Sequence, residues 1–167
     1  MLHILRYGDP ALRKKSGPVE KLNAAVRRLA EQMIKSMRAA AGVGLAAPQV
    51  GRNLRIAVVH HAEFQPKPLI LINPVILERS NDLTQVEEGC LSVPHLNVAV
   101  ARSKAVRVRY RAAGGETVER EFHDLMARIV QHECDHLEGK MIVDHLDLQT
   151  RLRFEAQLKK ANPGGDA

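Results

Sequence analysis

Two histidines and a glutamate near the end of the chain have the spacing found in metal-dependent hydrolases. They lie in the segment Gln131-His132-Glu133-Cys134-Asp135-His136. Four residues of an α-helix turn through about 400°, so His132 and His136 share a face on which two imidazoles can converge on one ion. Glu133 follows about 100° further round, where a carboxylate can take a proton from water. The pattern also arises by chance on exposed helices, so the interpretation depends on a third ligand.

A catalytic site of this type needs a third protein ligand and one open coordination position. The extended pattern HExxHxxGxxH would put a third histidine at position 142, but that residue is Ile142. A thermolysin-like site would use a glutamate from a later helix, and Glu155 is the candidate. Nothing around Glu155 distinguishes it from an ordinary charge on a helix surface, although the alternative stays open.

The remaining alternative is a thiolate, and the chain has two cysteines, too few for a disulfide scaffold. Cys134 would point about 200° away from His132 around the helix, which favours a role as a small buried residue. Cys90 lies in Glu88-Gly89-Cys90-Leu91-Ser92, where the glycine lets the backbone approach a metal closely. In isolation Cys90 would be interpreted as a buried thiol. Beside a histidine pair whose only other candidate partner is Glu155, it is predicted to bind the metal.

A third segment, Gly42-Val43-Gly44-Leu45-Ala46-Ala47-Pro48-Gln49, has residue types that suit contact with a ligand. Its two glycines allow close backbone approach, and Gln49 can offer an amide donor to a developing oxyanion. It is not a phosphate-binding loop, because no Lys-Ser/Thr pair follows it and a predicted helix, not a strand, precedes it. On its own this segment would be interpreted as a loop after a helix.

The elements that must position these segments can be predicted from hydrophobic spacing. Apolar residues at helical intervals predict a helix over 23–41, ended by Gly42. Runs of Val, Ile and Leu predict strands over 55–60 and 69–73, the second closed by Pro74. Further strands over 106–111 and 117–122 are expected to form a hairpin around Gly114-Gly115.

Two more helices follow in the second half of the chain. The helix that carries the histidine pair is expected to begin with Asp124 as its N-cap and to end at Gly139. The last helix is expected over 147–161, with three leucines on one side: Leu148, Leu152 and Leu158. Strands packed with a few helices, without regular βαβ alternation, predict an α+β fold. We expect mixed or antiparallel strands around a central metal-binding HExxH helix, with an N-terminal and a C-terminal helix.

The composition suits one domain and excludes several classes of protein. The chain has 167 residues, of which 45% are hydrophobic and 26% charged, so wholesale disorder is excluded. We expect a single catalytic domain over 1–161 and a flexible tail over 162–167. No apolar run approaches the roughly 18 residues of a membrane span, and the start lacks the apolar stretch of a secretory signal. A cytoplasmic protein with no membrane partner is therefore expected.

The net charge of +6 raises an alternative from another functional class, a basic ribosome- or RNA-binding module with a degenerate site. The last helix could supply the contacts through Arg151, Arg153, Lys159 and Lys160. However, the basic residues are spread along the chain and aromatic residues are few, which favours charge for solubility over a sequence-specific nucleic-acid surface. The intact histidine pair and Glu133 also argue against this alternative.

Together the three segments resemble the peptide deformylase family. The family pattern GΦGΦAAxQ matches 42–49, EGCΦS matches 88–92 and QHEΦDHLxG matches 131–139, all in the family's order. The opening residues 7–13 and the C-terminal helix extend the likeness over nearly the whole chain. The resemblance implies a bacterial-type enzyme that hydrolyses the N-formyl group from the initiator methionine of new polypeptides and releases formate.

The resemblance also implies a role for each matched residue. One divalent ion would be bound by Cys90, His132 and His136, and Glu133 would be the acid/base. The oxyanion would be stabilised by Gln49 and the backbone N–H of Leu91. The substrate backbone would pair with Val43 and Gly44, while its methionine side chain would enter an apolar pocket at Leu125, Ile129 and His132. Glu88 would support the site by pairing with Arg102.

Cofactor and partners follow from the same resemblance. Iron(II) is implied as the natural ion, with nickel, cobalt or zinc as substitutes. The partners would be N-formylmethionyl nascent peptides and, as in some family members, the ribosome through the C-terminal helix. Two positions depart from the family: Asn97 stands where bacterial members often have Arg, and Cys134 where Ile or Met is commoner. His95 is expected to line the cleft.

Overall fold

The computed structural model describes residues 1–161, with side chains as far as Gln157. The predicted tail over 162–167 lies outside these residues. The described residues form three helices, namely α1 (Ala24–Ala39), α2 (Asp124–Leu137) and α3 (Leu148–Ala161). Short 3-10 turns occur at η1 (Pro10–Arg13), η2 (Ala47–Val50) and η3 (Ile142–His145). Within the described residues no helix is both long and apolar enough to cross a membrane.

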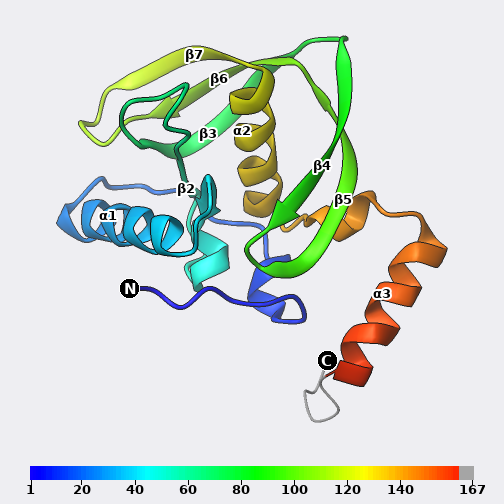
Figure 1. Ribbon diagram of the computed structural model, residues 1–167. Helices are drawn as coiled ribbons and strands as arrows, with labels where there is room; N and C mark the ends of the chain where they lie inside the picture. The colour runs from blue at the N-terminus through cyan, green and yellow to red at the C-terminus, as the bar shows by residue number, and fades with distance from the viewer. Residues whose placement is uncertain (162–167) are drawn as a thin grey trace.

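The strands form two antiparallel sheets (Figure 1). The larger sheet has the order β1-β2-β3-β6-β7, formed by β1 (Gly44–Ala46), β2 (Ile56–Val59), β3 (Leu69–Arg79), β6 (Ala105–Arg111) and β7 (Thr117–His123). The smaller sheet is a hairpin of β4 (Leu83–Cys90) and β5 (Val93–Ser103). The predicted α+β class with antiparallel strands is therefore confirmed, and so is the hairpin around Gly114-Gly115.

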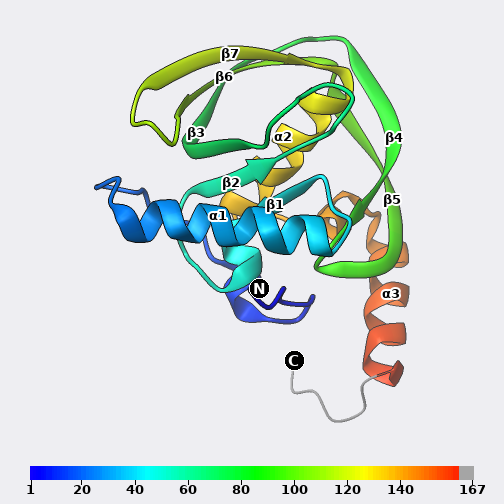
Figure 2. The same ribbon diagram turned by 60° about the vertical axis from the view of Figure 1, so that its left-hand side comes forward.

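Helices α1 and α2 cover opposite faces of the larger sheet (Figure 2). Side chains alternate along β2, so Ile56 and Val58 pack with α1 whereas Ala57 and Val59 pack with α2. The other side of α2 faces the β4–β5 hairpin, to which it is joined by hydrogen bonds such as that from Gln131 Nε2 to the Ser103 carbonyl (2.9 Å). Helix α2 is thus enclosed between the two sheets, and Arg128, Gln131, Glu133 and His136 are buried with it.

Two expectations about the boundaries of elements were wrong. Strand β3 does not close at Pro74, because the register shifts between Ile72 and Val75 and leaves Pro74 in an irregular stretch that needs no ladder N–H. Asn73 in this stretch has a φ of 51°. Its side-chain amide forms two hydrogen bonds with the backbone of Val19, accepting from the N–H and donating to the carbonyl. Helix α2 begins one residue early, with Asp124 in its first turn and His123 as its N-cap.

Helix α3, expected over 147–161, projects from the body of the molecule (Figures 1 and 2). Leu148 and Leu152 are 71% and 55% exposed, so these two leucines do not pack on the body, and the side chain of Leu158 lies outside the described residues. The helix is anchored instead by Phe154, whose ring meets that of Tyr7 edge-on with 5.6 Å between centroids.

Candidate metal centre and substrate cleft

One sulfur and two nitrogens from distant parts of the chain meet at a buried point. Cys90 ends β4, and its Sγ lies 3.3 Å from Nε2 of His136, which in turn lies 3.2 Å from Nε2 of His132. These three atoms all lie within 4.8 Å of one another. The structure therefore brings together the three residues that the sequence singled out, with Cys90 and both histidines turned toward one position.

The donor set fits a divalent transition metal. Two imidazole nitrogens and a thiolate are borderline to soft ligands, which suit iron, nickel, cobalt or zinc better than calcium or magnesium. Burial keeps the pKa of His136 well below its usual value, so this ring is neutral as a ligand must be. Burial would also lower the pKa of His132, but its hydrogen bonds to Cys90 and Glu88 raise it to about 10.

Glu88 orients the ring of His132 from behind. Its Oε2 lies 3.0 Å from Nδ1 of His132, which leaves Nε2 to face Cys90. Arg102 forms a two-pronged pair with this carboxylate, at 2.6 Å from Nε and 2.9 Å from Nη2. Burial would raise the pKa of Glu88, but the bonds to His132 and Arg102 lower it to about 2. The expected Glu88–Arg102 pair is confirmed.

Sequence reasoning missed a second cation in this network. Arg128 on α2 is buried, and its Nη1 lies 2.6 Å from Oε1 of Glu88 and 2.8 Å from the Val100 carbonyl. Its Nη2 donates to the carbonyl of Thr84 at 2.6 Å. Arg128 stands four residues before His132, so helical spacing places both on one face. That spacing was the available signal, but the partner carboxylate comes from a distant strand.

Glu133 lies beside the three donors without a partner of its own. It is 3% exposed, and its Oε2 makes no hydrogen bond within the described part of the chain. Burial raises the pKa of this carboxyl to about 7. A Cβ added to Gly44 would overlap the Glu133 carboxylate, so only glycine leaves room for it. This carboxyl can hold and release a proton near neutral pH.

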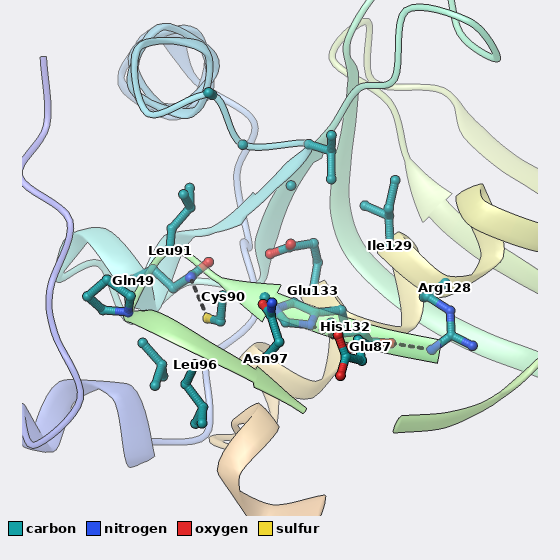
Figure 3. Close-up of a pocket in the computed structure, with 18 of the residues that line it drawn as sticks. Gln49, Glu87, Cys90, Leu91, Leu96, Asn97, Arg128, Ile129, His132 and Glu133 are labelled. Atoms are coloured by element: carbon teal, nitrogen blue, oxygen red, sulfur yellow. Dashed lines mark hydrogen bonds and ion pairs between the residues drawn. The ribbon is translucent and has the colours of Figure 1, made fainter. Parts of the chain in front are cut away.

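Gln49 is fixed with its donor end toward the site. Its Oε1 accepts the backbone N–H of Ala46 at 2.8 Å, and its Nε2 lies 3.7 Å from Sγ of Cys90 and 3.2 Å from Oγ of Ser92 (Figure 3). Leu91 follows Cys90 and lines the same cleft. Two candidate oxyanion donors are thus brought to the edge of the metal centre.

Two of the three donors, Cys90 and His132, line a cleft of about 400 Å³ between the sheets. One wall is β1 with the preceding Val43, and the other is β4 with the turn at Leu91. Strand β1 pairs only with β2, and β4 only with β5, among the described strands, so each has a free edge. Leu125 and Ile129 of α2 line the cleft, and so do His95, as expected, and Asn97.

The competing ligand, Glu155, lies elsewhere. It is on α3, where its Oε1 accepts from the Tyr7 hydroxyl at 2.8 Å and from Nε of Arg151 at 3.0 Å. Cys134 packs in the core between α2 and the larger sheet. Neither residue belongs to the group of donors at His132 and His136.

Comparison with known proteins agrees with this geometry. The family model described as polypeptide deformylase matches residues 1–152. A peptide deformylase of Synechocystis is 45% identical over 161 residues, covering 95% of this chain and 84% of the relative. One from Thermotoga neapolitana is 44% identical, covering 95% and 94%.

Solved structures give the same result. A peptide deformylase from Legionella pneumophila superposes with a TM-score of 0.89 at 33% identity, covering 99% of both chains. One from Synechococcus elongatus in complex with actinonin has a TM-score of 0.87 at 38% identity, covering 96% of this chain and 86% of the other. The chain therefore belongs to the peptide deformylase family, metalloenzymes that remove the N-formyl group from newly synthesised polypeptides.

Proposed function

We propose that Cys90, His132 and His136 hold the ion with which this enzyme deformylates new polypeptides, and that α2 is its metal-binding helix. The observation that carries the proposal is the convergence of Sγ of Cys90 with Nε2 of both histidines. We infer iron(II) as the ion in the cell, with nickel, cobalt or zinc as substitutes. When bound, the ion supplies Lewis-acid chemistry that lets water attack an amide carbon near neutral pH.

Glu133 moves the proton. Its carboxylate accepts a proton from the attacking water and passes it to the methionine nitrogen as the formyl C–N bond breaks. A pKa of about 7 suits both directions of transfer, because neither protonation state is strongly favoured. Gly44 allows the carboxylate to take this position, because any side chain at residue 44 would overlap it.

Gln49 and Leu91 stabilise the negative oxygen that develops on the formyl group. The Gln49 amide is already oriented by Ala46, so its Nε2 needs no reorganisation during the reaction. The backbone N–H of Leu91 supplies a second donor from the opposite wall. Loss of one such donor typically lowers the rate by about 100- to 1000-fold.

The peptide binds as an added strand between the two free sheet edges. Val43 and Gly44 offer backbone groups on one side, and β4 offers them on the other. The methionine side chain then enters the apolar part of the cleft at Leu125 and Ile129, beside the ring of His132.

Residues 1–161 act as one catalytic domain in the cytoplasm, where thiolate and iron(II) remain reduced. Docking to the ribosome through α3 is supported by the exposed Leu148, Leu152 and Arg153. Arg151 is engaged with Asp144 and Glu155, and the side chains of Lys159 and Lys160 lie outside the described residues.

Anaerobic purification, elemental analysis and a formate-release assay on formyl-Met-Ala-Ser test the proposal. We expect one ion per chain, loss of formate release on chelation, and recovery when iron(II) is returned. Formate release by the metal-free chain would contradict it. Salt-sensitive ribosome binding by a chain that never releases formate would favour the RNA-binding alternative.

A further inference from the structure

Glu87 lies at the cleft but has no part in the chemistry described above. It stands on β4 one residue before Glu88 and three before Cys90. Because side chains alternate along a strand, Glu88 and Cys90 face α2 whereas Glu87 faces the opposite side of the hairpin. Glu87 is exposed and lines the cleft (Figure 3).

The neighbours of Glu87 on that side of the hairpin carry no charge. The register pairs Glu87 with Ala99 and Gly89 with Asn97, so these four residues share one face. Ala99 is directly opposite Glu87, and Asn97 is its diagonal neighbour. Glu87 forms no ion pair or hydrogen bond with any other described residue, so its negative charge is open to a ligand.

The other formal charges that line the cleft are already compensated or buried. Glu88 and Arg128 are buried and paired with each other at 2.6 Å. Glu133 is buried beside the metal centre. Among the lining residues that the structure describes, Glu87 is thus the exposed carboxylate that an incoming peptide meets.

We propose that Glu87 makes the enzyme favour formylated peptides that carry Lys or Arg soon after the methionine. The proposal rests on the proposed function and on the peptide binding as a strand. If the methionine side chain points toward α2, alternation turns the second and fourth side chains toward the face of Glu87. A cation there approaches a carboxylate with no competing partner, whereas an acidic side chain is repelled.

The size of the preference for basic over acidic peptides depends on the distance between the charges and on their screening by water and salt. For unit charges roughly 5 Å apart in water, attraction favours the basic peptide about fourfold, and repulsion disfavours the acidic one by a similar factor. The two factors multiply, so a Lys over Glu ratio of about 16-fold is expected at low ionic strength. Salt near 0.5 M, where the screening length falls to a few ångströms, is expected to remove most of it.

The test compares kcat/KM for formate release from formyl-Met-Lys-Ala-Ser, formyl-Met-Gln-Ala-Ser and formyl-Met-Glu-Ala-Ser in the metal-loaded enzyme. The readout is the Lys over Glu ratio within each protein, which cancels differences in metal loading. We expect Glu87→Gln to lower the ratio to about twofold or less, and Asn97→Arg to lower it by placing a cation beside Glu87. Glu31→Gln, an equal charge change on the exposed face of α1, should leave the ratio as it was.

The two possible failures are distinguishable. If no peptide releases formate, the proposed function fails. If the Gln peptide is deformylated but the ratio is near one, does not respond to salt, or stays the same in Glu87→Gln, the role of Glu87 is overturned.

Discussion

Helices α2 and α3 are both 14 residues long and both rich in charged residues, yet the structure uses them in opposite ways. Most charged and polar residues of α2 are buried between the two sheets, where Arg128 and His132 are held by Glu88 of β4. Among the described side chains of α3, Arg153 is exposed and Arg151 and Glu155 are partly exposed, so water screens their charges. Comparable composition thus gives a reaction centre in one helix and an outer surface in the other. Burial makes the difference, because an enclosed charge must be matched by another group.

The largest expected difference between the two helices is that between Glu133 on α2 and Glu155 on α3. We expect Glu133→Ala to retain the metal and lose at least about 1000-fold in formate release, since the buried, unpartnered carboxyl that carries the proton is removed. Glu155→Ala is the matched control, because the same change on α3 should leave metal content and turnover within about twofold.

Elemental analysis and steady-state assays of both variants check this prediction. Near-normal turnover in Glu133→Ala would remove this residue from the mechanism. Metal loss in Glu155→Ala would revive the thermolysin-like arrangement.

The arginines provide the next comparison. Arg128→Met leaves the buried carboxylate of Glu88 with one cation fewer, so we expect the free energy of unfolding to fall by about 3–5 kcal/mol. Metal affinity should fall by about tenfold, because Glu88 orients His132. Arg151→Met on α3 should cost less than about 1 kcal/mol, since its side chain is 36% exposed. Urea unfolding and competition with a metal chelator measure both quantities, and equal costs for the two arginines would contradict the comparison.

The smallest effect concerns Asp144, which links η3 to Arg13 and Arg151. Burial would raise the pKa of this carboxyl, but hydrogen bonds from Arg13 and the Met141 N–H lower it. A lowered folded-state pKa gives stability that is present above the usual carboxyl pKa and is lost as pH falls through the folded value. We expect Asp144→Asn to cost less than about 1 kcal/mol at pH 7 and to flatten the decline in acid. Unfolding curves between about pH 2 and pH 7 test this, and an unchanged acid slope would count against it.

Local pattern predicted most of what positions the metal donors. The four-residue step from His132 to His136 is a property of one helix, and so is the exclusion of Cys134 from the pair. Cys90 needed an additional argument by elimination, because its position in space depends on the β4–β5 hairpin. Sequence analysis assigned no strands to that hairpin, although Val98 and Val100 alternate with small or polar residues.

Other features depend on contacts that no local pattern contains. Asn73 holds β3 together across Pro74 only because Val19 lies beside it in the fold. The exposure of Leu148 and Leu152 follows from α3 being anchored through Phe154, which is a tertiary contact with Tyr7. Arg128 pairs with the carboxylate of Glu88, which lies 40 residues away in the chain. Helix identity is thus predictable from spacing, whereas the partners of a buried charge are not.

X-ray absorption spectroscopy of the metal-loaded enzyme tests the central claim most directly, because it identifies the atoms around the ion. We expect one sulfur and two imidazole nitrogens in the wild-type chain, and loss of the sulfur signal in Cys90→Ala. A wild-type spectrum without sulfur, or one unchanged by Cys90→Ala, would contradict the account.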